Sequence, residues 1–159
     1  MANTELSGVI PPMTTPFTEQ GELNLAAVKT QIDWLVDCGV SGIAVGGSTG
    51  EGHTLQADEF KALIEAAMSA ADGRIAVIAG IITDSTRESV RRGQMIRDSG
   101  VAALQVTPVH YVFKPEDDDT VAHFSTLTGE TGMPVIIYNV IPWNYLSPEL
   151  LVRVMREVP

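Results

Sequence analysis

Two adjacent hydroxyl side chains, Ser48 and Thr49, lie in a glycine-rich turn whose residue types suit the binding of a small anion. The turn spans residues 46–52 and directly follows the apolar run 42–45. Its glycines, Gly47 among them, let backbone N–H groups approach a ligand, and both hydroxyls can donate hydrogen bonds to it. These residues therefore predict an anion site at the end of a strand.

The sequence of this turn favours a carboxylate over a nucleotide. It lacks the Gly-Lys-Ser/Thr ending of a phosphate loop, and the chain contains no Gly-x-Gly-x-x-Gly fingerprint. Because no lysine lies beside the turn to pair with a polyphosphate, a carboxylate is the better ligand. From the spacing alone, an ordinary turn in which Ser48 or Thr49 caps the next helix is an equally good interpretation.

Other polar residues follow the remaining apolar runs, where strands are expected to end. Thr15 comes after the first run, His110 and Tyr111 after the run 103–106, and Tyr138 closes the run 135–138. Ligands of α/β proteins bind at the carboxyl ends of parallel strands, so we expect these side chains to converge. The phenol of Tyr138 could give and take a proton there, and a core tyrosine with a satisfied hydroxyl is the alternative.

The histidines and the cysteine indicate no metal site. His53, His110 and His123 lack the spacing of metal ligands; we expect packing or surface roles for His53 and His123 and leave His110 open. The single cysteine, Cys38, is expected to be a buried structural thiol.

Strand-like and helix-like segments alternate about five times, with a period near 30 residues. The strands are apolar rather than alternating, which is typical of a parallel sheet covered on both faces. The expected strands are residues 8–10, 42–45, 75–79, 103–106 and 135–138. Ser85 with Glu88 and Ser147 with Pro148 mark helix starts.

Two architectures fit this alternation, a doubly wound open sheet and part of a closed (β/α)₈ barrel. A barrel needs about 250 residues, so residues 1–159 would be a single, incomplete domain that supplies about the first five units.

Composition narrows the class of protein. The chain of 159 residues is 45% hydrophobic and 19% charged, and its formal net charge is −10. This charge argues against binding to nucleic acid, which needs clustered lysine and arginine. No apolar run approaches the roughly 20 residues of a membrane helix, and no signal-peptide pattern is present, so we expect a cytoplasmic location without membrane contact.

Taken together, the strand-end segments resemble the dihydrodipicolinate synthase / N-acetylneuraminate lyase family over essentially the whole chain. The matching segments occur in the family's order: Thr15-Pro16-Phe17, Gly47-Ser48-Thr49-Gly50-Glu51, Leu55 and Glu59, Ala79-Gly80, Thr107-Pro108, Lys114-Pro115, His123-Phe124 and Tyr138-Asn139. The resemblance implies a (β/α)₈ TIM barrel and Schiff-base aldolase chemistry on pyruvate or another 2-keto acid. It also implies homo-tetramers or dimers in the cytoplasm, with no metal or organic cofactor.

The resemblance also implies roles for individual residues. Ser48 and Thr49, with Gly47 beside them, would hold the keto-acid carboxylate, and Tyr138 would be the general acid and base, with Ser48 on its proton relay. Tyr111 or His110, with Tyr111 favoured, would take the place of the family's tyrosine that reaches a neighbouring subunit.

The family's nucleophile is a lysine at the end of the sixth strand, which forms the Schiff base. The lysines here are Lys29, Lys61 and Lys114, and none follows a strand after Tyr138. By family spacing the lysine should come just past Pro159. We therefore expect residues 1–159 to be part of a longer enzyme and to be inactive and poorly stable alone.

The segment after Tyr138-Asn139 departs from dihydrodipicolinate synthases, which carry an arginine there for the second substrate. Trp143 and Asn144 stand in that segment and would either shape the substrate pocket or pack at a loop corner. The resemblance thus leaves open an aldolase that takes another aldehyde and a keto-sugar-acid dehydratase. A non-catalytic carboxylate-binding barrel and a flavodoxin-like binding domain are further alternatives.

Overall fold

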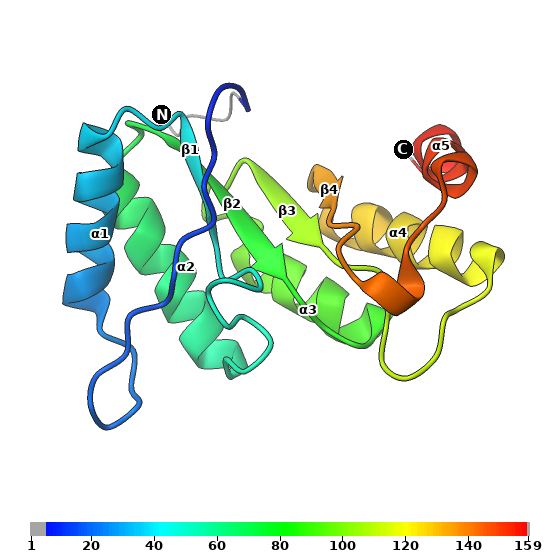
Figure 1. Cartoon of the computed structure of the whole chain (residues 1–159), viewed down its shortest axis with the longest axis horizontal. Coiled ribbons are helices and arrows are strands. Elements are labelled where there is room, and N and C mark those ends of the chain that lie inside the picture. The colour runs from blue at the N-terminus through cyan, green and yellow to red at the C-terminus, as the bar shows by residue number, and fades with distance from the viewer. Residues whose placement is uncertain (1–5, 159) are drawn as a thin grey trace.

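Four parallel strands form one sheet, in the order in which they occur along the chain (Figure 1). The computed structural model describes residues 6–158, and this count holds for them. The strands are β1 Gly42–Val45, β2 Ala76–Ile81, β3 Ala103–Val106 and β4 Val135–Ile137. Each pairs in parallel with the next, β1 with β2, β2 with β3 and β3 with β4.

The first expected strand, residues 8–10, is not a regular strand. The chain instead runs beside β1 and forms an isolated parallel bridge between Pro12 and Ala44. The amide of Met13 donates to the Ala44 carbonyl over 2.9 Å, and the amide of Ala44 donates to the Pro11 carbonyl over 3.0 Å. Pro11 and Pro12 have no N–H, which prevents a continuous ladder. The segment nevertheless occupies the first-strand position.

Five α-helices alternate with these strands in the described chain. They are α1 Leu25–Asp37, α2 Ala57–Ala71, α3 Thr86–Ile96, α4 Asp117–Thr131 and α5 Pro148–Glu157, and a short 3₁₀ helix, η1 Pro142–Asn144, precedes α5. Two predicted caps are confirmed: the Ser85 hydroxyl accepts from the Glu88 amide, and the Ser147 hydroxyl accepts from the Leu150 amide. Local side-chain chemistry thus sets where α3 and α5 begin.

The strand order decides between the two expected architectures. A doubly wound sheet reverses its strand order at a switch point, whereas here each strand is added on the same side of the previous one. Right-handed crossovers then place every helix on one face of the sheet. Successive helices indeed pack on one another, α1 on α2, α2 on α3, α3 on α4 and α4 on α5. The flavodoxin-like alternative is therefore wrong.

The two faces of the sheet carry side chains of different size. Alternate residues belong to the hydrophobic core that the sheet shares with the helices: Ile43, Val45, Val77, Ala79, Ile81, Leu104 and Val106. The residues between them point to the opposite face because side chains alternate along a strand. That face carries Ala44, Ala76, Ile78, Gly80 and Gln105. Its largely small side chains leave room for the loop that follows β1.

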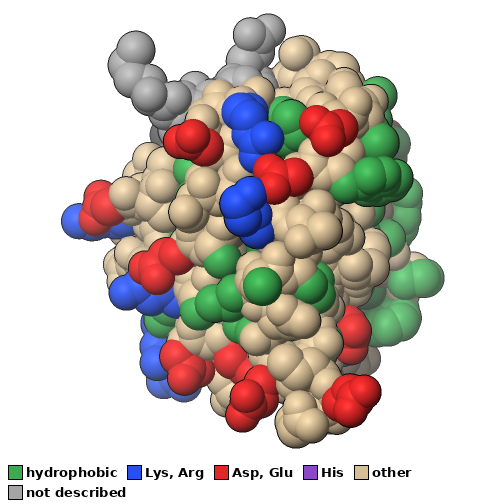
Figure 2. Space-filling model, turned by 90° about the vertical axis from the view of Figure 1, so that its left-hand side faces the viewer, with side chains coloured by type: hydrophobic (Ala, Val, Ile, Leu, Met, Phe, Trp, Pro, Cys, Tyr) green, Lys and Arg blue, Asp and Glu red, His purple; other side chains and the backbone are tan. Residues whose placement is uncertain are grey.

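Cys38 corrects one prediction, because its thiol is exposed rather than buried. It is the C-cap residue of α1 and lies outside the stripe of Val28, Ile32 and Leu35, which are buried. Figure 2 shows acidic and basic side chains interspersed on the face that carries α1, where Lys29 and Arg74 both pair with Asp33. Among the described residues, every helix is too short or too polar to span a bilayer.

Candidate functional site

The glycine-rich turn after β1 folds back on itself at the carboxyl edge of the sheet. The amides of Gly50 and Gly52 both donate to the Gly47 carbonyl, over 3.1 and 3.0 Å. A Cβ on Gly52 would lie 1.7 Å from the Gly46 carbonyl oxygen, and one on Gly80 in β2 would lie 2.5 Å from the Gly47 backbone. Only glycine fits at these two positions, which explains the glycines around the hydroxyl pair.

Ser48 and Thr49 are exposed at the tip of this turn. Within the described chain, neither hydroxyl and neither backbone amide of the pair has a hydrogen-bond partner. The next helix, α2, is capped by other residues, since the amide of its N-cap Gln56 donates to the Glu59 carboxylate over 2.8 Å. Capping by Ser48 or Thr49 is therefore wrong, and their donors remain available to a ligand.

The turn is held from two sides by side chains distant in sequence. From the segment beside β1, the Thr15 hydroxyl donates to the Gly50 carbonyl over 2.5 Å. From α3, Arg92 donates to the carbonyls of Gly52 and Leu55 over 2.9 and 2.8 Å. Thr15 was expected at this edge of the sheet, whereas Arg92 was missed by the sequence-based reasoning.

A polar cavity of about 470 Å³ opens beside the turn. Ser48, His53, Ile82, Thr83, Asp84, Glu88, Arg92 and His110 line it. Ser48 and His110 are 62 residues apart in the sequence, yet they line the same cavity. This agrees with the prediction that residues following parallel strands meet at one edge of the sheet. Asp84, which follows the end of β2, obeys the same rule and could have been found by it.

One hydrogen bond orients the ring of His110, and a carboxylate lies beside its other nitrogen. Its Nδ1 lies 2.9 Å from the Pro108 carbonyl, and its Nε2 lies 3.3 Å from the Asp84 carboxylate. Since a carbonyl only accepts, Nδ1 carries a proton. Nε2 then faces the Asp84 carboxylate.

The loop after β3 is joined to the loop after β4. The Trp143 indole N–H donates to the His110 carbonyl over 2.8 Å, and the Asn144 amide donates to the Val109 carbonyl over 2.6 Å. Asn144 is fully buried, whereas the indole of Trp143 is largely exposed. Both residues therefore pack at a loop corner, and Trp143 keeps a surface that a substrate could contact.

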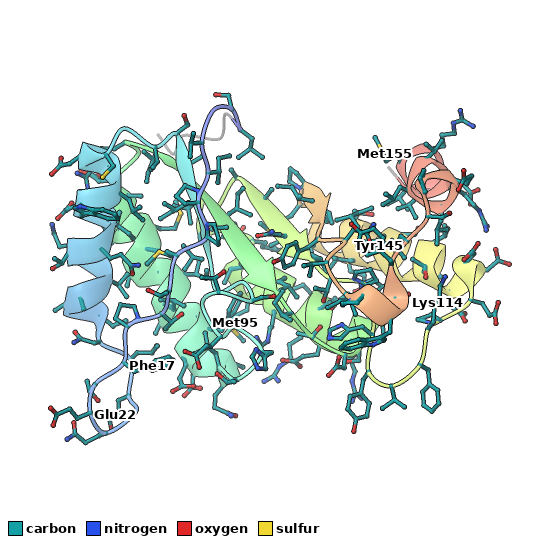
Figure 3. The ribbon with its side chains drawn as sticks, in the orientation of Figure 1. Phe17, Glu22, Met95, Lys114, Tyr145 and Met155 are labelled. Atoms are coloured by element: carbon teal, nitrogen blue, oxygen red, sulfur yellow. The ribbon has the colours of Figure 1, made fainter. Side chains whose placement is uncertain are left out.

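Beyond His110 the loop after β3 presents apolar side chains to solvent. Tyr111, Val112 and Phe113 are 70, 64 and 77% exposed. Val112 has a positive φ of 64°, a conformation that is unfavourable for a β-branched residue. Lys114 follows and lies just before α4 (Figure 3), so it is a loop residue as the sequence predicted.

Tyr138 directly follows β4 and continues its pairing, because its amide donates to the Val106 carbonyl over 2.7 Å. The side chain is half-buried and its hydroxyl has no partner within the described chain. Asn139 beside it exchanges two hydrogen bonds with the Leu146 backbone, which holds the loop between β4 and α5. Tyr138 does not line the cavity with Ser48, since two strands separate β1 from β4.

His123 is a packing residue, as predicted. It lies on α4 and is 4% exposed, with Nδ1 2.9 Å from the Thr86 hydroxyl. Burial lowers its pKa to about 4, against a smaller opposing effect of the Thr107 backbone. His53 is exposed. In the part of the chain that the structure describes, no cluster of three or more His, Cys, Asp or Glu side chains could hold a metal ion.

Comparison with known proteins gives consistent matches. The model of the Dihydrodipicolinate synthetase family matches residues 5–156. A 4-hydroxy-tetrahydrodipicolinate synthase of Salinibacter ruber is 37% identical over 155 residues, covering 96% of this chain and 51% of that protein. The crystal structure of dihydrodipicolinate synthase from Aquifex aeolicus superposes with a TM-score of 0.90 at 34% identity, covering 96% of this chain and 52% of that one.

A third match carries a ligand in its own structure. It is a prophage protein of the dihydrodipicolinic acid synthase family from E. coli K12, in complex with pyruvate; the TM-score is 0.90 at 29% identity, over 95% of this chain and 51% of that one. The chain spans about half the length of the curated relatives it matches. The prediction of a (β/α)₈ barrel, of which this chain supplies about the first five units, is confirmed.

Proposed function

The chain belongs to the dihydrodipicolinate synthetase family, and on this premise we propose that it supplies the keto-acid-binding part of a lyase or aldolase. The substrate is pyruvate or a related 2-keto acid, and the reaction passes through a lysine Schiff base located beyond residues 1–159. In the described chain Lys29 and Lys61 lie in α1 and α2, and Lys114 lies just before α4.

The observation that carries this proposal is the donor set of Ser48 and Thr49. The pair offers four hydrogen-bond donors without protein partners, two hydroxyls and two backbone amides. They lie on a glycine-rich turn and can donate to the two oxygens of one carboxylate. Gly47 supports the turn through its carbonyl, which accepts from Gly50 and Gly52.

Tyr138 is the proton shuttle in this proposal. Ser48 and Tyr138 follow β1 and β4, which are roughly 14 Å apart along the sheet at about 4.8 Å per strand. In a closed eight-stranded barrel, such strands face one another across the interior rather than lying side by side. The half-buried phenol without a partner is then available to move protons during imine formation and carbon–carbon bond making or breaking.

His110, Trp143 and Asn144 limit the second substrate. Residues 140–147, directly after Tyr138-Asn139, contain no arginine. The corner built from Trp143 and Asn144 lies in that segment and is hydrogen-bonded to the loop after β3. An aldehyde that needs no carboxylate-binding arginine, or a keto-sugar acid that loses water, suits this corner. His110, held by Asp84 and Pro108, contacts the polar part of that substrate.

The assembly in this proposal is a homo-tetramer or dimer in the cytoplasm. Tyr111, which is 70% exposed, reaches the site of a neighbouring subunit. The partners are small molecules, a 2-keto acid and an aldehyde, and the reaction uses no metal or organic cofactor.

Borohydride trapping tests the proposal. The longest protein that the reading frame encodes is incubated with pyruvate and borohydride, and its intact mass is measured. The keto carbon and a lysine amine condense with loss of water, and the hydride reduces the imine to a stable secondary amine. A mass increase of one reduced pyruvate unit is expected. If the folded protein gives no adduct with pyruvate or other 2-keto acids, the Schiff-base mechanism is excluded and a non-catalytic barrel is supported.

A further inference from the structure

Arg92 joins α3 to the loop that carries Ser48 and Thr49. Its guanidinium donates through one terminal nitrogen to the Gly52 carbonyl over 2.9 Å and through the other to the Leu55 carbonyl over 2.8 Å. The two acceptors are 40 and 37 residues away in the sequence. A planar fork with fixed donor directions suits two neighbouring carbonyls, so this side chain sets the spacing between them.

The charge of Arg92 is buried and compensated. Its side chain is 8% exposed, and its Nε lies 3.3 Å from the Glu88 carboxylate. The guanidinium carbon lies 5.2 Å from the centre of the Phe60 ring, a favourable position over its face. A buried cation is costly unless it is paired and hydrogen-bonded, and here each requirement is met. Such a group resists displacement and can hold a loop in one conformation.

The effect of Arg92 reaches the hydroxyl pair through the backbone. The same Gly52 whose carbonyl accepts from Arg92 donates its own amide to the Gly47 carbonyl over 3.0 Å. Gly47 directly precedes Ser48, so two consecutive hydrogen bonds connect α3 to the ligand donors. Arg92 also lines the cavity that Ser48 lines.

From this connection we infer that Arg92 is a positioning residue: it holds the turn of residues 46–52 in the conformation that presents Ser48 and Thr49 to a carboxylate ligand. Arg92 itself does not touch the ligand carboxylate; it acts through the carbonyls of Gly52 and Leu55. The ligand part of this inference rests on the proposed function, whereas the effect on the turn does not.

The experiment compares Arg92→Lys with Arg91→Lys in the longest protein that the reading frame encodes. Arg91 is a matched control, because it is the neighbouring arginine and also pairs with Glu88. It is 63% exposed, and within the described chain it makes no hydrogen bond to the loop. Hydrogen exchange of peptides covering residues 46–55 reports the order of the loop. Titration with pyruvate gives the Kd. Initial rates at varied pyruvate, with any second substrate that the protein turns over, give KM and kcat.

Lysine keeps the charge but loses the fork, so exchange in residues 46–55 should rise about tenfold in Arg92→Lys, with peptides of α4 and α5 unchanged. The Kd and KM for pyruvate should rise about tenfold as well, more than kcat falls. Arg91→Lys should match the wild type in every readout. Glu88→Gln removes the charge that pairs with Arg92 but leaves the hydrogen bonds from Arg92 to Gly52 and Leu55 in place. Hydrogen exchange in residues 46–55 should rise in this variant, but less than in Arg92→Lys. If Arg92→Lys does not fold, this variant tests the inference in its place.

Each contrary result is distinct. Unchanged exchange in residues 46–55 of the folded Arg92→Lys variant overturns the inference. A loosened loop with an unchanged pyruvate Kd also overturns it, because Arg92 would then support the fold without positioning the donors. A wild-type protein that binds no 2-keto acid overturns the proposed function instead, and the exchange comparison still decides what Arg92 does to the turn.

Discussion

The hydroxyl of Thr15 donates to the carbonyl of Gly50 over 2.5 Å, and this bond joins the segment beside β1 to the turn that carries Ser48 and Thr49. Thr15 is 6% exposed, so water does not replace the bond if it is lost. The segment that contains Thr15 is irregular because of Pro11 and Pro12, yet it reaches the functional edge of the sheet through this side chain.

Replacing Thr15 by valine removes this bond while keeping the shape of the side chain. The buried Gly50 carbonyl then lacks its partner, so we expect the free energy of unfolding to fall by about 1–3 kcal/mol. Urea denaturation followed by circular dichroism measures the change. Thr14→Val is the matched control; its hydroxyl accepts from Gln31 at the surface, and a loss below about 0.5 kcal/mol is expected. Equal losses in the two variants would contradict a special role for Thr15.

Gly80 tests the close approach between β2 and the turn. A Cβ at this position would lie 2.5 Å from the backbone of Gly47, which cannot move away as a flexible side chain would. Gly80→Ala should therefore destabilise the protein by about 1–3 kcal/mol through overpacking. Gly129→Ala on α4 is the control, because nothing lies within 4 Å of its added Cβ and alanine favours a helix by about 0.5–1 kcal/mol. Thermal melts of the two variants should shift in opposite directions.

His123 makes stability depend on pH. Its pKa is about 4 in the folded protein and near 6.5 when unfolded, so the unfolded chain takes up the proton first as the pH falls. The stability that the neutral ring contributes is fully present above pH 6.5 and is lost as the pH falls toward 4. Between pH 7 and pH 5 the loss from this residue is about 2 kcal/mol.

His123→Gln should flatten this part of the pH profile, whereas His53→Gln, at an exposed position, should leave it unchanged. Urea titrations of the three proteins at several pH values between 5 and 7.5 supply the comparison. Parallel profiles for the wild type and His123→Gln would mean that other groups cause the acid sensitivity.

The elements could be predicted from sequence where their causes are local. Ser85 and Ser147 begin helices because their hydroxyls accept from amides three residues ahead. Arg92 could not be found in this way, because its carbonyl acceptors lie 37 and 40 residues away and only the packing of α3 beside the turn brings them together. Cys38 was predicted wrongly because apolar character was taken to mean burial, although the residue lies outside the buried stripe of α1.

At the candidate site, too, some features could be predicted from sequence and others could not. Ser48 and His110 were predicted to converge because parallel strands end at one edge, and the cavity between their loops confirms it. The bond between Trp143 and His110 had no sequence signal, since it depends on how two loops cross. The sequence therefore predicts that the site lies at the carboxyl edge of the sheet, but it does not predict the contacts between the loops that follow the strands.

Trp143 should control the order of the loop after β3. Trp143→Phe keeps the aromatic ring but removes the indole N–H that donates to the His110 carbonyl. We expect hydrogen exchange in residues 107–114 to rise about threefold to tenfold, because the bond is exposed and contributes about 0.5–1.5 kcal/mol. Trp34→Phe on α1 is matched in exposure, 63% against 61%, and should leave this loop unchanged. An unaffected loop in Trp143→Phe would show that the Asn144 bond alone is sufficient.

Ser48 is the direct test of the carboxylate-binding turn. Its hydroxyl is exposed and has no partner in the described chain, so Ser48→Ala should leave the free energy of unfolding within about 0.5 kcal/mol of the wild type. Loss of one donor to a charged oxygen should nevertheless raise the Kd for pyruvate about tenfold. Ser69→Ala, at an exposed position of α2, is the control and should change neither quantity. Because stability and affinity separate in this variant, an unchanged Kd would exclude the Ser48 hydroxyl from carboxylate binding even if the protein proves to be a Schiff-base enzyme.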